Sequence, residues 1–135
     1  MSRFLLDTGA AQDFVNNRHN VVSRVDAERR RGNRIGICVP VLGELWSGVE
    51  GSATRERNLR RLRNALTRLV VWPYDNAAAE IFGRLFIQLR RIGRPMQQID
   101  VQAAAIAFAL GDTTVVTVDS DLFDIPDLQV ENWSA

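Results

Sequence analysis

Short apolar segments rich in β-branched residues alternate along this chain with longer segments of helical periodicity. The expected strands are residues 3–8, 34–39, 69–73, 113–118 and 128–132. The expected helices are residues 10–17, 21–31, 41–51, 55–69, 76–93 and 98–110. Strands that alternate with helices form a mainly parallel sheet with helices on both faces. We therefore predict an α/β fold of three α/β/α layers, with about five strands in its central sheet and one domain over residues 1–135.

The composition is typical of a globular protein, with 46% hydrophobic and 24% charged residues. No apolar run approaches the roughly 20 residues that are needed to cross a bilayer. Asp7 also interrupts the N-terminal apolar segment, where a signal peptide stays apolar. We expect a cytoplasmic protein with no membrane partner. Its single cysteine, Cys38, lies in an apolar run and is expected to pack in the core.

All 17 basic residues are arginines, and the chain has no lysine. This excludes mechanisms that need a lysine, such as nucleotide binding by a P-loop or Schiff-base catalysis. It also argues against a receiver domain, which uses a lysine after a late strand. A haloacid-dehalogenase-like phosphatase needs a second aspartate two residues after the first, and Gly9 occupies that position here.

Several acidic residues lie where a parallel sheet of this kind binds its ligands, beyond the carboxyl ends of the strands. Asp7 ends the first expected strand, and Asp119 and Asp121 follow the fourth. Glu44 lies one turn into the helix after the second strand, and Asp100 opens the last long helix. We therefore expect one cleft to collect these side chains.

Each acid taken alone has a simpler explanation, as a helix cap or as a charge that interacts favourably with a helix dipole. Taken together they have a stronger implication, because carboxylates about 4 Å apart repel by roughly 4 kcal/mol at an effective dielectric constant near 20. A cleft that gathers four of them needs cations, and hard divalent ions prefer oxygen ligands. Zinc is disfavoured, because Cys38 and His19 are the only residues of their types, and His19 lies in a polar segment that we expect to be exposed.

Three blocks of sequence occur in the order found in one known family. They are FLLDTG at the start, VPVLGELWSGV after the second strand, and QQIDVQAAAIAFALGDTTVVTVDSDLFDIPDLQVENW near the end. On these blocks, which extend over nearly the whole chain, the sequence resembles the PIN-domain ribonucleases and specifically the VapC-type toxins of type II toxin–antitoxin systems. The last block is the most specific. The resemblance implies a PIN-like fold.

The resemblance also implies a metal-dependent endoribonuclease that hydrolyses RNA phosphodiester bonds with Mg²⁺ or Mn²⁺. Asp7 and Asp100 match the principal metal ligands of the family, with Glu44 and Asp119 in support. These four acids are the expected catalytic residues. The small hydroxyl residues that line such a cleft are matched by Thr8 and Thr117.

Two positions depart from the family pattern. Gly9 occurs where Asn or Ser is common, and Val118 occurs where Asn is common. Polar groups around metal ligands tune a site. An alternative therefore stays open, in which the chain is a catalytically weakened PIN domain that acts as an RNA- or protein-binding module.

The arginine-rich helix at residues 55–69 has three possible roles. It can be an ordinary solvated helix, because its leucines follow helical spacing. Its arginines can instead guide RNA phosphates toward the cleft; the candidates are Arg55, Arg60, Arg61 and Arg63. The family resemblance adds a third role near an antitoxin groove, because VapC toxins are silenced by a VapB antitoxin. The apolar side chains that either line such a groove or pack in the core are Leu45, Trp46, Phe82 and Phe86. A homodimer, and a hetero-oligomer with the antitoxin, are also implied.

Overall fold

The fold is built on a five-stranded parallel sheet. A computed structural model describes residues 1–118 and 121–134. The strands are β1 (Arg3–Leu6), β2 (Arg34–Cys38), β3 (Val70–Trp72), β4 (Thr113–Thr117) and β5 (Gln129–Asn132). Their order across the sheet is β3-β2-β1-β4-β5, and every neighbouring pair is parallel. The predicted α/β class and the central sheet of about five strands are confirmed.

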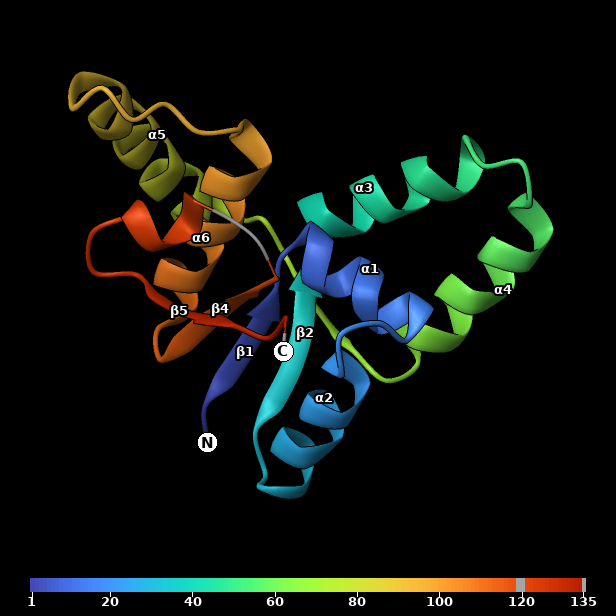
Figure 1. Ribbon diagram of the computed structural model, residues 1–135. Helices are drawn as coiled ribbons and strands as arrows, with labels where there is room; N and C mark the ends of the chain where they lie inside the picture. The colour runs from blue at the N-terminus through green and yellow to red at the C-terminus, as the bar shows by residue number, and fades with distance from the viewer. Residues whose placement is uncertain (119–120, 135) are drawn as a thin grey trace.

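Helices cover the sheet in two groups (Figure 1). The first group follows β1 and β2 and consists of α1 (Thr8–Asn16), α2 (Val21–Arg30), α3 (Val39–Glu50) and α4 (Arg55–Leu66). The second group lies on the other side and consists of α5 (Asn76–Arg91) and α6 (Gln98–Leu110), followed by the short 3₁₀ helix η1 (Asp121–Asp124). The chain moves outward from β1 to β3 and then crosses back to β4, and right-handed crossovers place the two groups on opposite faces.

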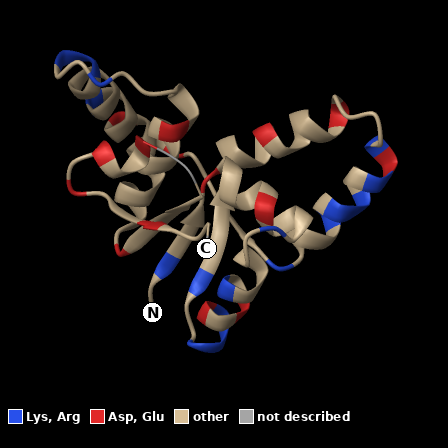
Figure 2. Ribbon diagram, in the orientation of Figure 1, with Lys and Arg blue, Asp and Glu red and all other residues tan. Residues whose placement is uncertain are grey.

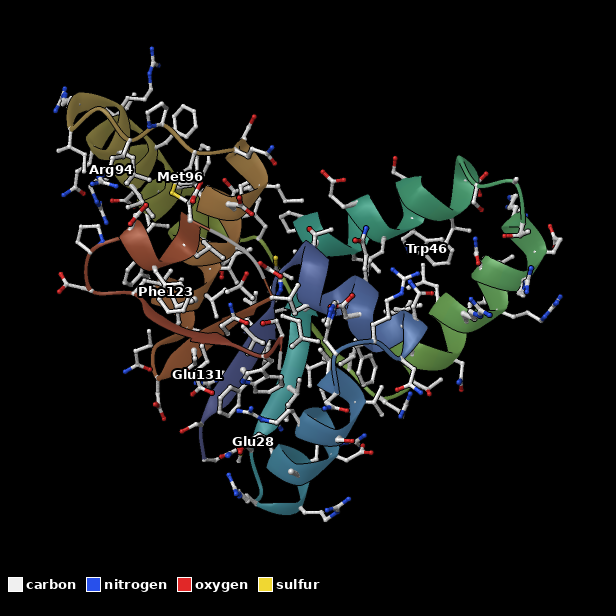
Figure 3. The ribbon with its side chains drawn as sticks, viewed as in Figure 1. Glu28, Trp46, Arg94, Met96, Phe123 and Glu131 are labelled. Atoms are coloured by element: carbon white, nitrogen blue, oxygen red, sulfur yellow. The ribbon has the colours of Figure 1, made fainter. Side chains whose placement is uncertain are left out.

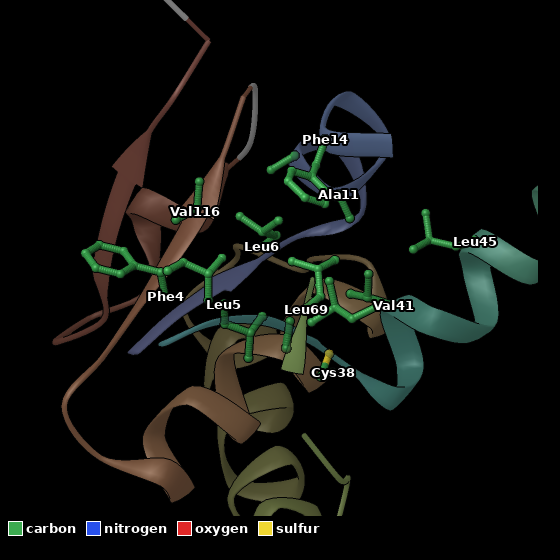
Figure 4. Close-up of a cluster of buried hydrophobic side chains, with 14 of the residues drawn as sticks. Phe4, Leu5, Leu6, Ala11, Phe14, Cys38, Val41, Leu45, Leu69 and Val116 are labelled. Atoms are coloured by element: carbon green, nitrogen blue, oxygen red, sulfur yellow. The ribbon is translucent and has the colours of Figure 1, made fainter. Parts of the chain in front are cut away.

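Two hydrophobic clusters form the core. The larger one joins the sheet to α1–α4 and includes residues of α5 and α6 as well, with Leu5, Leu6 and Phe14 almost fully buried (Figure 4). Cys38 belongs to this cluster as a free cysteine, and burial raises the pKa of its thiol to about 11. The predicted core role of Cys38 is therefore confirmed. The smaller cluster joins α5, α6 and η1 to β4 and includes Leu89, Val101 and Val115.

The strand ends differ slightly from the sequence expectation. The first strand stops at Leu6 rather than at residue 8, because Asp7 is the N-cap of α1 and Thr8 is already helical. At the other end of the chain, the Trp133 N–H donates to the Thr117 carbonyl oxygen at 2.8 Å, and its fully buried ring packs on Phe4 at 5.5 Å between centroids. These contacts fix β5 beside β4 at the edge where β1 and β4 end.

No helix within residues 1–118 and 121–134 combines the length and the apolar character that crossing a membrane requires.

Candidate active site

A polar cleft of about 480 Å³ opens at the carboxyl end of β1. Among the described residues, three acids contribute to its wall, and they come from three different elements: Asp7 after β1, Asp100 in the first turn of α6, and Asp121 at the start of η1. The remaining lining residues are Thr8, Gly9, Pro95, Met96 and Gln97. Figure 3 shows Met96 in the segment that connects α5 to α6. In the part of the chain that the structure describes, the cleft lining therefore contains acidic and neutral groups but no arginine.

Asp7 has two roles in this structure. Its side chain is buried, and its Oδ1 accepts a hydrogen bond from the Ala10 N–H at 2.8 Å, which caps α1. The same carboxylate lines the cleft. The cap and the cleft position were alternatives at the sequence level, but they are compatible, because the cap holds the carboxylate in a fixed orientation at the cleft wall.

The electrostatics of the cleft disfavour negative charge. Burial raises the pKa of Asp7, and the negative charges of Asp100 and Asp13 add to this; hydrogen bonds from the Ala10 N–H and the Thr117 side chain act in the opposite direction. The pKa of Asp100 is also raised, by burial first and then by the charge of Asp121. The carboxylates therefore sense one another, and a bound cation would relieve this repulsion.

The donor set fits a hard divalent cation. Its ligand atoms are carboxylate oxygens, which Mg²⁺ and Mn²⁺ prefer. Thr8 Oγ1 is buried beside them and has no hydrogen-bond partner among the residues that the structure describes. In the same residues, no three acidic, histidine or cysteine side chains lie close enough to enclose a metal ion alone.

The four expected acids meet only in part. Asp7 and Asp100 share the cleft, as predicted. Glu44 is exposed on α3 and lines an adjoining cavity instead, which is joined to the cleft through Gln97. Asp119 lies outside the described residues. The two expected hydroxyl residues are both near Asp7. Thr8 lines the cleft, and the buried Thr117 side chain forms a hydrogen bond with the Asp7 carboxylate.

Sequence reasoning expected Asp121 near the cleft but did not include it among the catalytic or metal-binding residues, and it assigned no role to the segment at residues 95–97. Asp121 was noted as an acid after the fourth strand, but a capping role was as plausible as a place in the cleft. Residues 95–97 carry no chemical signal beyond ending the preceding helix, and only the packing of α6 against α5 brings them over Asp7.

The two departures from the family pattern are neighbours in space. A Cβ atom added at Gly9 would lie 3.2 Å from Val118 Cγ2, which is a tight contact. The missing side chain at position 9 therefore makes room for the valine at position 118. Gly9 and Val118 thus lie next to each other beside Asp7.

The arginines of α4 differ in availability. Arg55 is tied to Glu50 at 2.8 Å and to Glu56 at 2.7 Å, so it is a poor candidate for RNA binding. Arg60, Arg61 and Arg63 are exposed, and none forms an ion pair with another described residue. Figure 2 shows basic segments on α4 and at the end of α5, on either side of the acidic sheet edge.

The four apolar residues that could form a groove do not share one surface. Leu45 is buried in the larger cluster, and Trp46 lies between α3 and α4 and packs partly against that cluster (Figure 3). Phe82 and Phe86 stack on each other at 5.3 Å on α5 and pack against the smaller cluster. Core packing is thus their main role. Leu45 alone also lines a groove between α1, α3 and α4.

Comparison with known proteins places these features in a family. The PIN-domain family model matches residues 4–128. The chain is 32% identical to the tRNA(fMet)-specific endonuclease VapC of Shigella flexneri, over 99% of this chain and all of that protein. Among solved structures, VapBC2 from Rickettsia felis bound to a promoter DNA fragment has a TM-score of 0.90 at 28% identity, covering 97% of this chain and 98% of that one. DNA-bound VapBC from Salmonella typhimurium has a TM-score of 0.87 at 32% identity, covering 98% and 99%. The chain therefore belongs to the PIN-domain family and, within it, to the VapC proteins.

Proposed function

We propose that this protein is the toxin of a type II toxin–antitoxin pair, an endoribonuclease that hydrolyses RNA and is held inactive by a VapB-type antitoxin. The observation that carries the proposal is the cleft that Asp7, Asp100 and Asp121 share at the carboxyl end of β1. Membership in the VapC proteins supports the same activity.

Asp7 and Asp100 are the proposed ligands of a divalent cation, Mg²⁺ or Mn²⁺, and nucleases of this family generally depend on such a metal. When bound, the cation supplies a water of lowered pKa and neutralises charge at the phosphate. The α1 cap orients the Asp7 carboxylate, and the fold holds Asp100 opposite it. Glu44, Asp119 and Asp121 are the acids proposed to complete the site, through water or by orienting the attacking water.

Substrate binding is assigned to the surfaces around the cleft. RNA phosphates are repelled by the acidic wall unless a cation is present, so distant basic side chains have to contribute to binding. Arg60, Arg61 and Arg63 supply exposed positive charge on one side. A tRNA is the first substrate to test, because the Shigella relative is named a tRNA-specific endonuclease.

The antitoxin is assigned to the groove between α1, α3 and α4. Its floor is apolar, with Leu45, Val49 and Leu62, and its rim carries Arg18 and Arg61. A groove with these properties suits an amphipathic segment that carries acidic residues. We further propose that the chain forms a homodimer and a larger complex with the antitoxin, as VapC membership implies.

Expression in a bacterial host tests this function. We expect the chain alone to stop growth and to cause site-specific cleavage of cellular RNA, and co-expression of the antitoxin to restore growth. The Asp100→Asn variant, expressed at the same level, is the control that should leave growth and RNA intact. Normal growth and intact RNA with the wild-type chain would argue against the toxin assignment.

A further inference from the structure

A second polar cavity, of about 610 Å³, adjoins the acidic cleft between α3 and α6. Its residues from α3 include Gly43, Glu44 and Ser47, and those from α6 and its N-cap include the three glutamines Gln97, Gln98 and Gln102. Gln98 and Gln102 are one helical turn apart, which places both on the same face of α6. Gln97 lines both cavities and therefore marks where they meet.

The polar groups of this cavity are accessible, because Ser47 and Gln98 are exposed and Gln102 is half-buried. Within residues 1–118 and 121–134, the side chains of Gln98, Gln102 and Ser47 have no hydrogen-bond partner. An amide carries two donor hydrogens and an acceptor oxygen, so the glutamines can match a flat ligand that has both kinds of group. A cavity of this volume is also within the range of small-ligand sites.

The charge of the cavity selects against phosphate. Among the residues that the structure describes, Glu44 is the only charged residue in its lining, and no arginine is among them. A phosphate would be repelled by Glu44, whereas a neutral nucleobase would not be. A glutamine amide can accept from an exocyclic amino group and donate to a ring nitrogen of the same base edge, and specific RNA recognition usually reads the edges of unpaired bases.

We propose that this cavity is a base-reading subsite, which binds an unpaired nucleobase with an exocyclic amino group next to the scissile phosphate. The proposal rests on the proposed ribonuclease function and adds a specificity determinant to it. An RNA chain with one phosphate in the acidic cleft reaches the subsite through the junction at Gln97. Gln98 and Gln102 then read the base edge, and a glutamine amide oxygen accepts from its amino group.

The test compares the Gln98→Ala/Gln102→Ala double variant with wild type on single-stranded RNA. The cut is first mapped in one fixed sequence, and the base on either side of it is then replaced by each of the other three. We expect wild type to prefer an amino-bearing base over uracil at one of these positions. In the double variant this preference, measured as a ratio of kcat/KM values, should fall about tenfold or more. Gln88→Ala, an exposed glutamine on α5, is the matched control and should keep the wild-type ratio.

A second readout separates this proposal from the proposed function. Binding of the same RNAs is measured by fluorescence anisotropy in the Asp100→Asn background, with and without the two glutamine substitutions. A base preference in binding that needs the glutamines supports the subsite even if wild type cuts no RNA. If wild type cuts RNA but the double variant loses activity equally on every base, or keeps the preference, the subsite is wrong and the ribonuclease stands. A double variant that is impaired only in antitoxin binding would overturn the subsite as well.

Discussion

Two substitutions of Asp7 distinguish its role as the N-cap of α1 from the effect of its negative charge. Asp7→Asn keeps an oxygen that can accept from the Ala10 N–H, and asparagine is a good N-cap residue. It removes a charge that burial and the neighbouring charges of Asp100 and Asp13 disfavour. Without metal at pH 7, we therefore expect Asp7→Asn to melt at or above the wild-type temperature.

Asp7→Ala removes both the negative charge and the hydrogen bond that caps α1. The Ala10 N–H is buried and would be left without its 2.8 Å partner. The cost of such a loss is about 1–3 kcal/mol relative to Asp7→Asn. For a chain of this length, that corresponds to a melting temperature lower by roughly 4 °C per kcal/mol.

Asp75 offers a matched control. It caps α5 with the same geometry, accepting from the Ala78 N–H at 3.0 Å, but it is exposed and lies outside the acidic cleft. Asp75→Ala should cost about 1 kcal/mol relative to Asp75→Asn. Both Asp75 variants should retain RNA cleavage, whereas both Asp7 variants should lose it.

The effect of Asp7→Asn should also depend on pH. Because the pKa of Asp7 in the folded protein is raised above the ordinary aspartate value of 3.8, protonation favours the folded state. The stability from this group is fully present below the unfolded pKa and is lost as pH rises through the folded pKa. Asparagine does not titrate, so the melting temperature of Asp7→Asn minus that of wild type should grow between pH 4 and pH 7.

Calorimetry in EDTA over this pH range measures all of these differences. The reasoning would be refuted if Asp7→Asn melted as low as Asp7→Ala at pH 7, because the charge would then stabilise the metal-free fold. A melting difference that shrinks as pH rises would refute the sign of the pKa shift.

Two further predictions concern the scaffold. Gly36→Ala places a Cβ against the Val70 carbonyl of the neighbouring strand, so it should destabilise the protein by about 1–3 kcal/mol in urea unfolding. Its control, Gly83→Ala, lies in open space on α5 and should stabilise the protein by about 0.5–1 kcal/mol. Equal effects of the two substitutions would contradict the close contact between β2 and β3. Trp133→Ala removes a fully buried ring and should lower the free energy of unfolding by about 3–5 kcal/mol in the same measurement. A decrease below about 1 kcal/mol would show that the C-terminal segment does not hold β5 in place.

The sheet could be predicted from sequence because its strands carry strong local signals. The buried run at residues 35–38 is apolar throughout, as expected for a strand covered on both faces. The helix from Gln98 to Leu110 was predicted with the bounds that the structure has. Position at a strand end or in a first helical turn was enough to bring Asp7 and Asp100 together, because topology alone fixes that edge of the sheet.

The rest of the site depends on tertiary packing. The apolar face of α3, which includes Val41 and Leu45, turns toward the core, and this leaves Glu44 exposed beside α6 rather than in the cleft with Asp7. Sequence spacing does not fix the direction of the helix axis. The place of Asp121 in the cleft likewise depends on how η1 packs after β4, which the acidic turn itself does not encode.

RNA cleavage as a function of divalent-ion concentration tests most directly whether the paired carboxylates of Asp7 and Asp100 hold a cation that the reaction needs. Initial rates are measured on one defined RNA with Mn²⁺ or Mg²⁺, for wild type and for Asp100→Asn, beside metal-free melts that check folding. We predict no wild-type cleavage in EDTA, a rate that saturates with added metal, and no detectable cleavage by a folded Asp100→Asn variant at any metal concentration. Wild-type cleavage in EDTA, or cleavage by Asp100→Asn at the wild-type rate, would contradict the proposed site.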